Sequence, residues 1–407
     1  MSKLNTDVII VGGGLVGATL AALLGKSGIA CIIIEAGSKT NQSKAYAADP
    51  RALALTHASR HIFDSINVWS RLPKDRIAYF EGMYVWDENG KGNVEFDSAD
   101  LCQSMLGYIV EQSVLQGTLE LVIDSMPGIK VNHNTGLTDM RWQEDHVSVT
   151  LDNGEELTAQ LVVGADGVKS TCRKLAGINY KVHDYQQTAV ACVVKTTLPH
   201  ENIARQRFLT DGPLAFLPMS DDKQCAIVWS TTHKQAEELL KMSTTDFNMF
   251  LQESFEHTLG EILESEPRAS FPLSRAEAEH YCVERFALAG DAAHSIHPLA
   301  GQGANLGLLD AASLGQLIVK AKTGNKDIAS RRVLRTYERW RRGENKLMMM
   351  TMESFKYAFE NQTPPVPVLR NSALNIANSF IPLKHTIMRH AMGLVGDLPR
   401  LTRGEPL

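Results

Sequence analysis

The sequence predicts an α/β protein in which a discontinuous Rossmann-like nucleotide-binding domain carries an inserted antiparallel-sheet domain and a C-terminal helical region. Three observations predict this fold. The chain opens with an apolar run, a glycine-rich turn and a helical pattern; strand-like stretches fill its middle; and a second glycine-rich stretch follows another apolar run near residue 290. A length of 407 residues is long for one core and favours two or three domains.

The N-terminal segment predicts a βαβ unit. Residues 8–11 form a short apolar run rich in β-branched side chains, which is typical of a buried parallel strand, and residues 12–26 follow with a helical pattern. A second apolar run covers residues 31–34. Two strands joined by one helix in this way form the opening unit of a nucleotide-binding domain.

A glycine pattern and an acid in this unit predict a dinucleotide site. Gly12, Gly14 and Gly17 in GGGLVG fit the pattern GxGxxG between strand and helix, and Glu35 ends the second strand. The glycines allow a tight turn, the approach of a pyrophosphate and close helix packing, while the acid accepts from the ribose hydroxyls. The acid favours an unphosphorylated ribose, and therefore FAD or NAD(H) over NADP(H). The alternative is a purely structural glycine turn.

The middle of the chain predicts the inserted sheet. Asn153-Gly154, between two alternating runs, is a strong hairpin signal, and LVVGADG returns to buried-strand character at residues 161–163. Four strand-like stretches follow between Thr188 and Thr232: AVACVVKTT, RQRFLT, PLAFLP and QCAIVWSTT. Pro, Gly and Asp turns separate them, as in an antiparallel sheet.

The late glycine-rich stretch predicts a return to the first domain. The apolar run RFALA precedes GDAAHSIHPLAGQGANLGLLDA, and a helical pattern then continues to about Lys320. Small residues recur every four positions, at 303, 307, 311 and 315. They therefore lie on one helix face and allow a close approach to a neighbouring element, whether a ligand or the sheet.

The C-terminal region after Asp327 is helical and basic, with six arginines between residues 331 and 342. We interpret it as a packed helix whose arginines are solvated or salt-bridged; the alternative is a surface for membrane lipid or a protein partner. The nucleotide-binding domain is thus assigned to residues 1–76, 105–182 and 281–325, the inserted domain to 77–104 and 183–280, and the helical region to 326–407.

Composition excludes several classes of protein. A net charge of −5 with 21% charged residues argues against a nucleic-acid partner. The sequence contains no apolar window long enough for a transmembrane helix, and its six cysteines form no CxxC pair. We therefore expect reduced thiols, no metal site and a cytoplasmic protein.

The combination of three motifs resembles the class A flavin-dependent aromatic hydroxylases, which carry an N-terminal GxGxxG, a middle DG motif and a late GD motif. Here the middle motif is VGADGVKSTCR and the late one ALAGDAAHSIHPLAGQGANLG. The stretch HPLAGQGANLGLLDA is most similar to the ubiquinone-biosynthesis hydroxylases that act on polyprenylphenols, and the similarity covers nearly the whole chain. The resemblance implies FAD as the cofactor.

The resemblance also implies roles for single residues. Asp291 is expected to accept from a ribityl hydroxyl of FAD, and Asp166 to lie at the pyrophosphate. Arg51 in DPRALALT corresponds to an arginine that contacts the flavin. The alternatives are a helix-capping aspartate, an ordinary Asp-Gly turn and a surface arginine.

The start of the late helix is expected to face the flavin ring. Gly301 and Gly303 lie beside this start, and the unpaired N–H groups of Gly303, Ala304 and Asn305 would point at the pyrimidine edge. These donors and the helix dipole would stabilise the negative charge of the reduced flavin.

The loop before this helix is expected to shelter the reaction. Pro298 removes an N–H and stiffens the loop, so it would shape an apolar space beside the ring. His297 is a candidate for a base that deprotonates a phenol, and His294 is another; a structural hydrogen bond is the alternative for each.

The resemblance implies a substrate pocket and a reaction. Phe216, Leu217 and Pro218 are expected to roof the pocket, with a core-facing Phe216 as the alternative. The expected reaction is hydroxylation of a polyprenylphenol ring with molecular oxygen. GMYVWD and the C-terminal AMGL favour ring position 5, whereas DPRALAL is more similar to a sibling enzyme that acts at another carbon. A flavin reductase or dehydrogenase and a non-enzymatic prenyl carrier are the alternatives.

The source of electrons and the partners follow from the same resemblance. Only one GxGxxG is present, so the reductant is NAD(P)H bound transiently over the FAD domain, or a protein electron donor. A prenylated substrate implies peripheral contact with the inner membrane, a lipid-binding partner or other ubiquinone-biosynthesis proteins, with the C-terminal region as the contact. The sequence leaves a homo-oligomer open.

Overall fold

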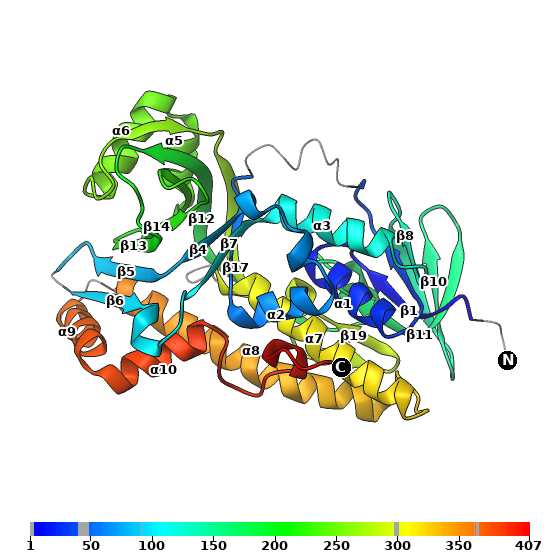
Figure 1. The fold of residues 1–407 in the computed structure, drawn as a ribbon. Coiled ribbons are helices and arrows are strands. Elements are labelled where there is room, and N and C mark those ends of the chain that lie inside the picture. Colours follow the sequence, from blue (N-terminus) through cyan, green and yellow to red (C-terminus); the bar gives the residue numbers. More distant parts are fainter. Residues whose placement is uncertain (1–3, 40–48, 91, 297–300, 362, 364–365) are drawn as a thin grey trace.

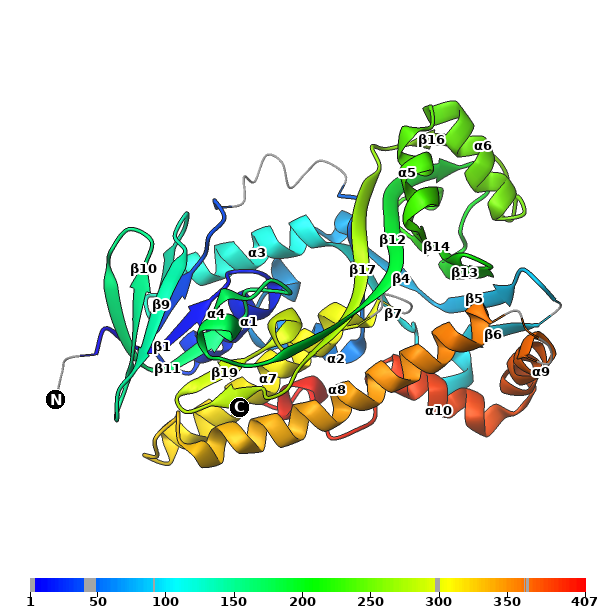
Figure 2. The same ribbon diagram turned by 180° about the vertical axis from the view of Figure 1, so that it is seen from behind.

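The computed structural model describes residues 4–39, 49–90, 92–296, 301–361, 363 and 366–407. Figure 1 shows two halves, one built on a mostly parallel sheet with helices and the other on a large antiparallel sheet. A long helix runs along one side of both halves and leads into the C-terminal helices, as the reverse view in Figure 2 also shows. The predicted fold class is confirmed.

The first sheet has the strand order β18-β19-β11-β1-β2-β8, and five of these strands run parallel. Strands β1, β2 and β19 and the last residues of β11 are mostly buried and apolar, as expected when helices cover a parallel sheet. Helix α1 (Leu15–Lys26) contacts both α3 (Gln112–Asp124) and α7 (Gln302–Thr323). The strands are β1 (Thr6–Val11), β2 (Cys31–Ile34), β8 (Ile129–Asn132), β11 (Glu156–Gly164), β18 (Cys282–Val283) and β19 (Phe286–Leu288).

Strand β11 pairs in two different ways. Its first residues pair antiparallel with β10 (Val147–Leu151), which in turn pairs with β9 (Leu137–Trp142). Its last residues pair parallel with β1. The predicted hairpin is present, and Gly154 has a φ of +82°, which a side chain would disfavour. Strand β11 therefore delivers the DG motif, which follows Gly164, to the carboxyl end of the parallel sheet.

The second sheet has the order β20-β17-β12-β15-β14-β13-β5-β6, and all its pairs are antiparallel except β13 with β5. The four predicted strands appear in it as β12 to β15. One face packs under α5 (His233–Lys241) and α6 (Thr244–Ser254), where Trp229 and Phe216 are buried. The strands are β5 (Gly82–Asp87), β6 (Asn93–Asp97), β12 (Tyr180–Thr196), β13 (Ile203–Leu209), β14 (Gly212–Pro218), β15 (Gln224–Thr232), β16 (Ile262–Ser265), β17 (Ala269–Ala278) and β20 (His294–Ser295).

Smaller elements join the two halves. A three-stranded sheet consists of β3 (Ala52–Leu55), β7 (Gly107–Glu111) and β4 (Ile77–Phe80). Strand β20 pairs with β17, so the second sheet also takes up residues that the sequence assigned to the third piece of the nucleotide-binding domain. The remaining helices are α2 (His57–Ser65), α4 (Thr171–Leu175), α8 (Arg331–Glu360), α9 (Val366–Ser379) and α10 (Ile381–Ala391).

Two further expectations concern the whole chain. Among the described residues, no helix combines the length and the apolar character needed to span a bilayer. All six cysteines are free thiols, four of them buried, and burial raises the pKa of the Cys192 and Cys225 thiols to about 12.

Candidate functional site

The glycine turn after β1 is built so that only glycine fits at two of its positions. Gly12 has a φ of +103°, and a side chain there would collide with the carbonyl of Ala165. A side chain at Gly17 would collide with the carbonyl of Gly12, because α1 crosses close to the strand. Gly14 caps α1 and faces open space. The turn is thus packed on its inner side and open where a pyrophosphate would approach.

Glu35 lies at the end of β2 against this turn. Its carboxylate accepts hydrogen bonds from the backbone N–H groups of Gly13 and Gly37, each at 2.6 Å. These contacts fix the carboxylate beside the open side of the turn and leave lone pairs for further donors. Gln116 of α3 donates to the carbonyl of Gly13 (2.8 Å), so α3 forms another wall beside the turn.

Asp166 of the DG motif has one carboxylate oxygen without a partner. Its Oδ2 accepts from the N–H of Cys172 (3.0 Å), whereas Oδ1 is buried and has no hydrogen-bond partner in the described part of the chain. Ala165, the preceding residue, packs directly on Gly12. A buried acceptor left unpaired is costly, and its place beside the glycine turn fits a bound group that supplies donors.

Asp291 of the GD motif also has an unpaired carboxylate. Asp291 is exposed, and no described residue donates a hydrogen bond to its side chain. Desolvation by neighbouring protein atoms raises the pKa of the Asp291 carboxyl. Gly290, with φ +60°, brings the loop against Val16 of α1. The free acceptor of Asp291 therefore lies close to the start of the nucleotide-binding helix.

The start of α7 is open towards a cavity. Gly301 caps the helix with φ +59°, and no described residue fills the space where a side chain at Gly303 would stand. The helix begins at Gln302, so the N–H groups left without helical acceptors are those of the first helical residues, Gln302 to Ala304. Gly303 and Ala304 thus have free N–H groups at the helix start, and their contact with a cofactor stays a prediction.

The side chain of Asn305 holds neighbouring elements together, and a cofactor contact of this residue stays a prediction. Its side chain is buried and makes four hydrogen bonds: it accepts from Thr56 N and Ser59 Oγ, and it donates to the carbonyls of Ala54 and Gly301. As the fourth residue of α7, its N–H lies where the helix's own hydrogen bonds begin. The side chain of Asn305 therefore connects the end of β3 to the start of α7.

The small-residue face of α7 packs on α1. A side chain at Gly307 would collide with Val16, and Gly315 lies against Leu20 and Leu23. The small residues of α7 therefore let it pack closely on α1. Gly303, at the start of the same face, has no described residue against it. This packing brings the GD loop, the glycine turn and the start of α7 together.

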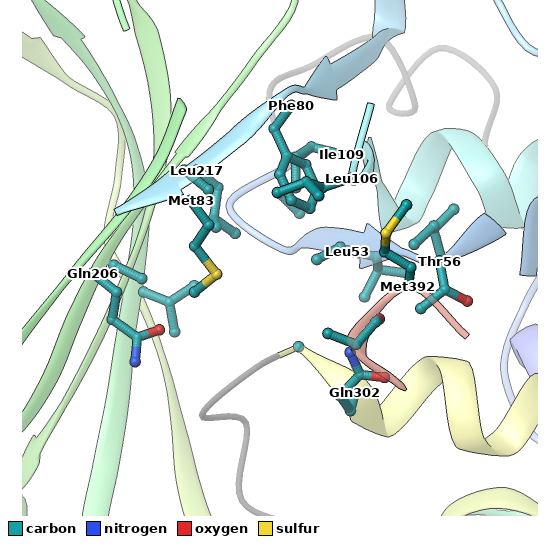
Figure 3. A pocket seen from close by; sticks show the side chains of 18 of the residues that line it. Leu53, Thr56, Phe80, Met83, Leu106, Ile109, Gln206, Leu217, Gln302 and Met392 are labelled. Carbon is teal, nitrogen blue, oxygen red and sulfur yellow. The ribbon is translucent and has the colours of Figure 1, made fainter. Parts of the chain in front are cut away.

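An apolar cavity of about 330 Å³ lies between the second sheet, the three-stranded sheet, the start of α7 and α10 (Figure 3). Leu217 lines it. Phe216 and Pro218 do not, because alternate residues of a strand face opposite sides of a sheet. Phe216 instead stacks on Phe255 in the core under α5 and α6, with ring centroids 3.8 Å apart. Of the three residues expected to roof the pocket, the structure places Leu217 there.

Four other residues were expected at the site: Arg51, His294, His297 and Pro298. Arg51 is exposed and lies just before β3, with its Nε 3.4 Å from the Asp49 carboxylate. His297 and Pro298 lie outside the described residues. His294 is 2% exposed and its Nε2 is 2.5 Å from Asp310, so it is held in the core and not presented to the cavity.

A buried polar cluster around Asp310 was not predicted. One oxygen of Asp310 accepts from Gly290 N and contacts His294, while the other accepts from Arg341 Nε at 2.8 Å and Asn345 Nδ2 at 3.2 Å. Burial alone would raise the pKa of Asp310, but the charges and hydrogen bonds of His294 and Arg341 outweigh it and lower the pKa to about 2. The cluster ties the GD loop to α7 and α8.

Comparisons with known proteins agree with this geometry. The family described as FAD binding domain matches residues 5–351. The ubiquinone hydroxylase UbiL of Rhodospirillum rubrum is 35% identical over 98% of this chain and 93% of its own. The 3-demethoxyubiquinol 3-hydroxylase of Escherichia coli is 33% identical over 97% of this chain and 100% of its own. Among solved structures, p-nitrophenol 4-monooxygenase PnpA of Pseudomonas putida has the same fold, with a TM-score of 0.79 at 20% identity, over 98% of this chain and 100% of its own.

Proposed function

The chain belongs to the FAD binding domain family, and on that premise we propose that it hydroxylates the aromatic ring of a prenylated phenol in ubiquinone biosynthesis, with FAD as cofactor and molecular oxygen as co-substrate. One observation carries the proposal: the open start of α7 forms part of the wall of an apolar cavity. A cofactor ring at that wall and an aromatic ring in the cavity would stand next to each other.

Residues on three elements would hold FAD. The glycine turn and the start of α1 would bind the pyrophosphate, Glu35 the adenosine ribose, and Asp166 and Asp291 would accept from further hydroxyl or N–H donors. When bound, FAD supplies the activation of oxygen, which no side chain provides.

The chain's own residues would orient the reactants and exclude water. The N–H groups at the start of α7 and the helix dipole favour negative charge on the ring beside them. Leu53, Leu106, Ile109 and Met392 give the cavity an apolar lining (Figure 3), which suits a dry reaction chamber. As a base for the phenol, His297 remains the proposed candidate, because His294 is committed to Asp310.

The reductant in this proposal is NAD(P)H or a protein electron donor. The ring carbon is proposed to be position 5, with the sibling position as the alternative. The curated relatives include a 3-demethoxyubiquinol 3-hydroxylase, so the two positions need a direct test.

The proposal is tested by supplying the FAD-loaded protein with NAD(P)H, oxygen-18 gas and a short-chain prenylphenol. Incorporation of one labelled oxygen atom into the ring is expected, and nuclear magnetic resonance of the product identifies the carbon. Oxidation of NAD(P)H with electron transfer to a quinone, and no labelled product, would assign the protein to the reductases instead.

A peripheral membrane contact through the C-terminal helices is part of the proposal. Ile376, Phe380 and Ile381 at the junction of α9 and α10 are 57–61% exposed, and Arg389 on α10 is exposed as well. The last part of α10 lines the cavity through Ile387, Met388 and Ala391, and Met392 directly after the helix lines it as well. An apolar patch with nearby positive charge suits an anionic bilayer surface, and α10 would connect that surface to the cavity.

Substitution of this patch tests the membrane contact. Deleting the whole region would also remove Arg341 from the core, so Ile376, Phe380 and Ile381 are replaced by serine instead. Binding to vesicles containing an anionic phospholipid is expected to fall by roughly tenfold or more, since the apolar anchor is lost. Serine at Leu121, Leu198 and Leu263, which are 47–52% exposed elsewhere, is the matched control. Equal vesicle binding by both triple variants would remove the proposal.

A further inference from the structure

Gln206 stands out in the wall of the cavity. It lies on β13, and its side chain belongs to the sheet face formed by Ala204, Ala215, Leu217 and Val228. These neighbours are all apolar; Ser230 on β15 adds the other polar group of this wall. Gln206 is only 6% exposed. A flexible amide is therefore buried in a wall that otherwise suits a hydrocarbon.

The amide of Gln206 has no hydrogen-bond partner among the described residues, and yet it is not sealed in the protein, since it borders the cavity. The contrast with Asn305 is clear, because the amide of Asn305 makes four hydrogen bonds to protein groups. An amide removed from bulk water without a partner destabilises a fold. The position of this amide at the cavity indicates that it hydrogen-bonds a polar atom of the ligand.

The position of Gln206 defines which part of a ligand it meets. Figure 3 shows Gln206 on the sheet side of the cavity and Gln302, at the start of α7, on the other side. Gln302 donates to the carbonyl of Ala391 at 3.4 Å, so its amide has a protein partner. A flat ring in the cavity would present one edge to Gln206 and another to the start of α7.

We propose that the Gln206 amide hydrogen-bonds an oxygen substituent of the substrate ring and thereby sets which ring carbon faces the start of α7. This inference rests on the proposed function and adds the determinant of ring orientation. The amide carries both a donor and an acceptor, so it matches a ring hydroxyl or an alkoxy oxygen. A site built to bind such an oxygen discriminates strongly against a ring that lacks it.

The test compares two ligands that differ in one group: a 2-prenylphenol and the same molecule with methyl in place of the hydroxyl. Each is titrated into the FAD-loaded protein, and binding is read from the change in the flavin absorption spectrum. We expect the wild type to bind the phenol about tenfold more tightly than the methyl compound. In Gln206→Leu the preference should disappear because phenol binding weakens, while binding of the methyl compound is kept.

Two further measurements separate this role from a structural one. Gln206→Leu should unfold at the same or a higher temperature than the wild type in the absence of ligand, since the amide makes no hydrogen bond to the described residues that the variant would lose. Gln224→Leu, on β15 of the same sheet but outside the cavity lining, is the matched control and should keep the preference for the phenol. The regiochemistry of any product should become mixed in Gln206→Leu and stay single in the control.

Each outcome bears on the inference. An unchanged phenol preference in Gln206→Leu would overturn it even if the protein hydroxylates the ring. Loss of the preference would support it even if no hydroxylated product forms, and in that case the proposed reaction fails by itself. A variant that unfolds well below the wild-type temperature would overturn it too, because the amide would then serve the fold.

Discussion

At the scale of single residues, the candidate cofactor site is a set of groups that the fold leaves open. Gly14 faces free space, Asp166 has a buried oxygen without a partner, and Asp291 has no donor in the described part of the chain. The glycine pattern was predicted from its local context, and the two aspartates were predicted from the family resemblance. Gln206 was not predicted, since nothing in RQRFLT shows which residue borders a cavity.

Gly14→Ala is expected to weaken FAD binding with little effect on the fold. The new methyl group would meet no atom of the described residues, and the backbone at Gly14 suits any residue, but the methyl would stand where the pyrophosphate is proposed to approach. The expected loss is about tenfold or more in FAD affinity, which corresponds to about 1.4 kcal/mol. Fluorescence titration of FAD measures it. Gly128→Ala, which also places a methyl in open space, is the control; equal affinities for both variants would contradict the prediction.

Asp291→Asn is expected to shift stability and cofactor affinity in opposite directions. Desolvation raises the pKa of Asp291, and an acid with a raised folded-state pKa disfavours the folded state at any pH above that value. The amide removes this cost, so the melting temperature of the cofactor-free protein at neutral pH should rise. FAD affinity should fall, because the charged acceptor is lost. A fall in both quantities would show that Asp291 is a structural cap.

At the scale of elements, local patterns were sufficient for the βαβ unit, the Asn153-Gly154 hairpin and the strands β12 to β15. The orientation of β14 was harder to predict. Its residues are largely buried on both faces, so PLAFLP has no polar alternation to show that Leu217 faces the cavity and Phe216 the core. The pairing of β20 with β17 depends on tertiary packing and has no local signal.

The Asp310 cluster also depends on packing between elements. Asp310 lies on α7 and Arg341 on α8, and the sequence gives no sign that one arginine among six is buried. Asp310→Asn leaves the positive charge of Arg341 unpaired in the core. We expect the free energy of unfolding at pH 7 to fall by about 3–5 kcal/mol, as for other broken buried pairs. Asp327→Asn, which breaks a partly exposed pair with Arg285, should cost less than about 1 kcal/mol.

The effect of pH on this variant has a defined sign. The folded-state pKa of Asp310 is lowered to about 2 from the ordinary 3.8. Its ionised form therefore stabilises the fold fully above 3.8, and this contribution is lost as the pH falls towards 2. Urea unfolding at several pH values should show the difference between wild type and Asp310→Asn shrinking in that window. A difference that stays constant would mean that the Asp310 charge does not stabilise the fold.

At the scale of the whole molecule, three distant parts of the chain meet at one place. The turn after β1, the DG motif after β11 and the GD loop with α7 are separated by more than a hundred residues each, yet Gly12 touches Ala165 and Val16 touches Gly290 and Gly307. The cavity beside them is closed by the second sheet and by α10. This convergence follows from sheet topology. Local sequence patterns alone do not predict it, whereas the family resemblance did.

The convergence of these parts on one FAD is the central claim, and FAD stoichiometry tests it most directly. The purified, folded protein is stripped of cofactor and titrated with FAD while absorbance and protein fluorescence are followed. One FAD per chain is expected, with binding weakened by Gly14→Ala and not by Gly128→Ala. A folded protein that takes up no FAD, or that binds it equally well in both variants, would contradict the account.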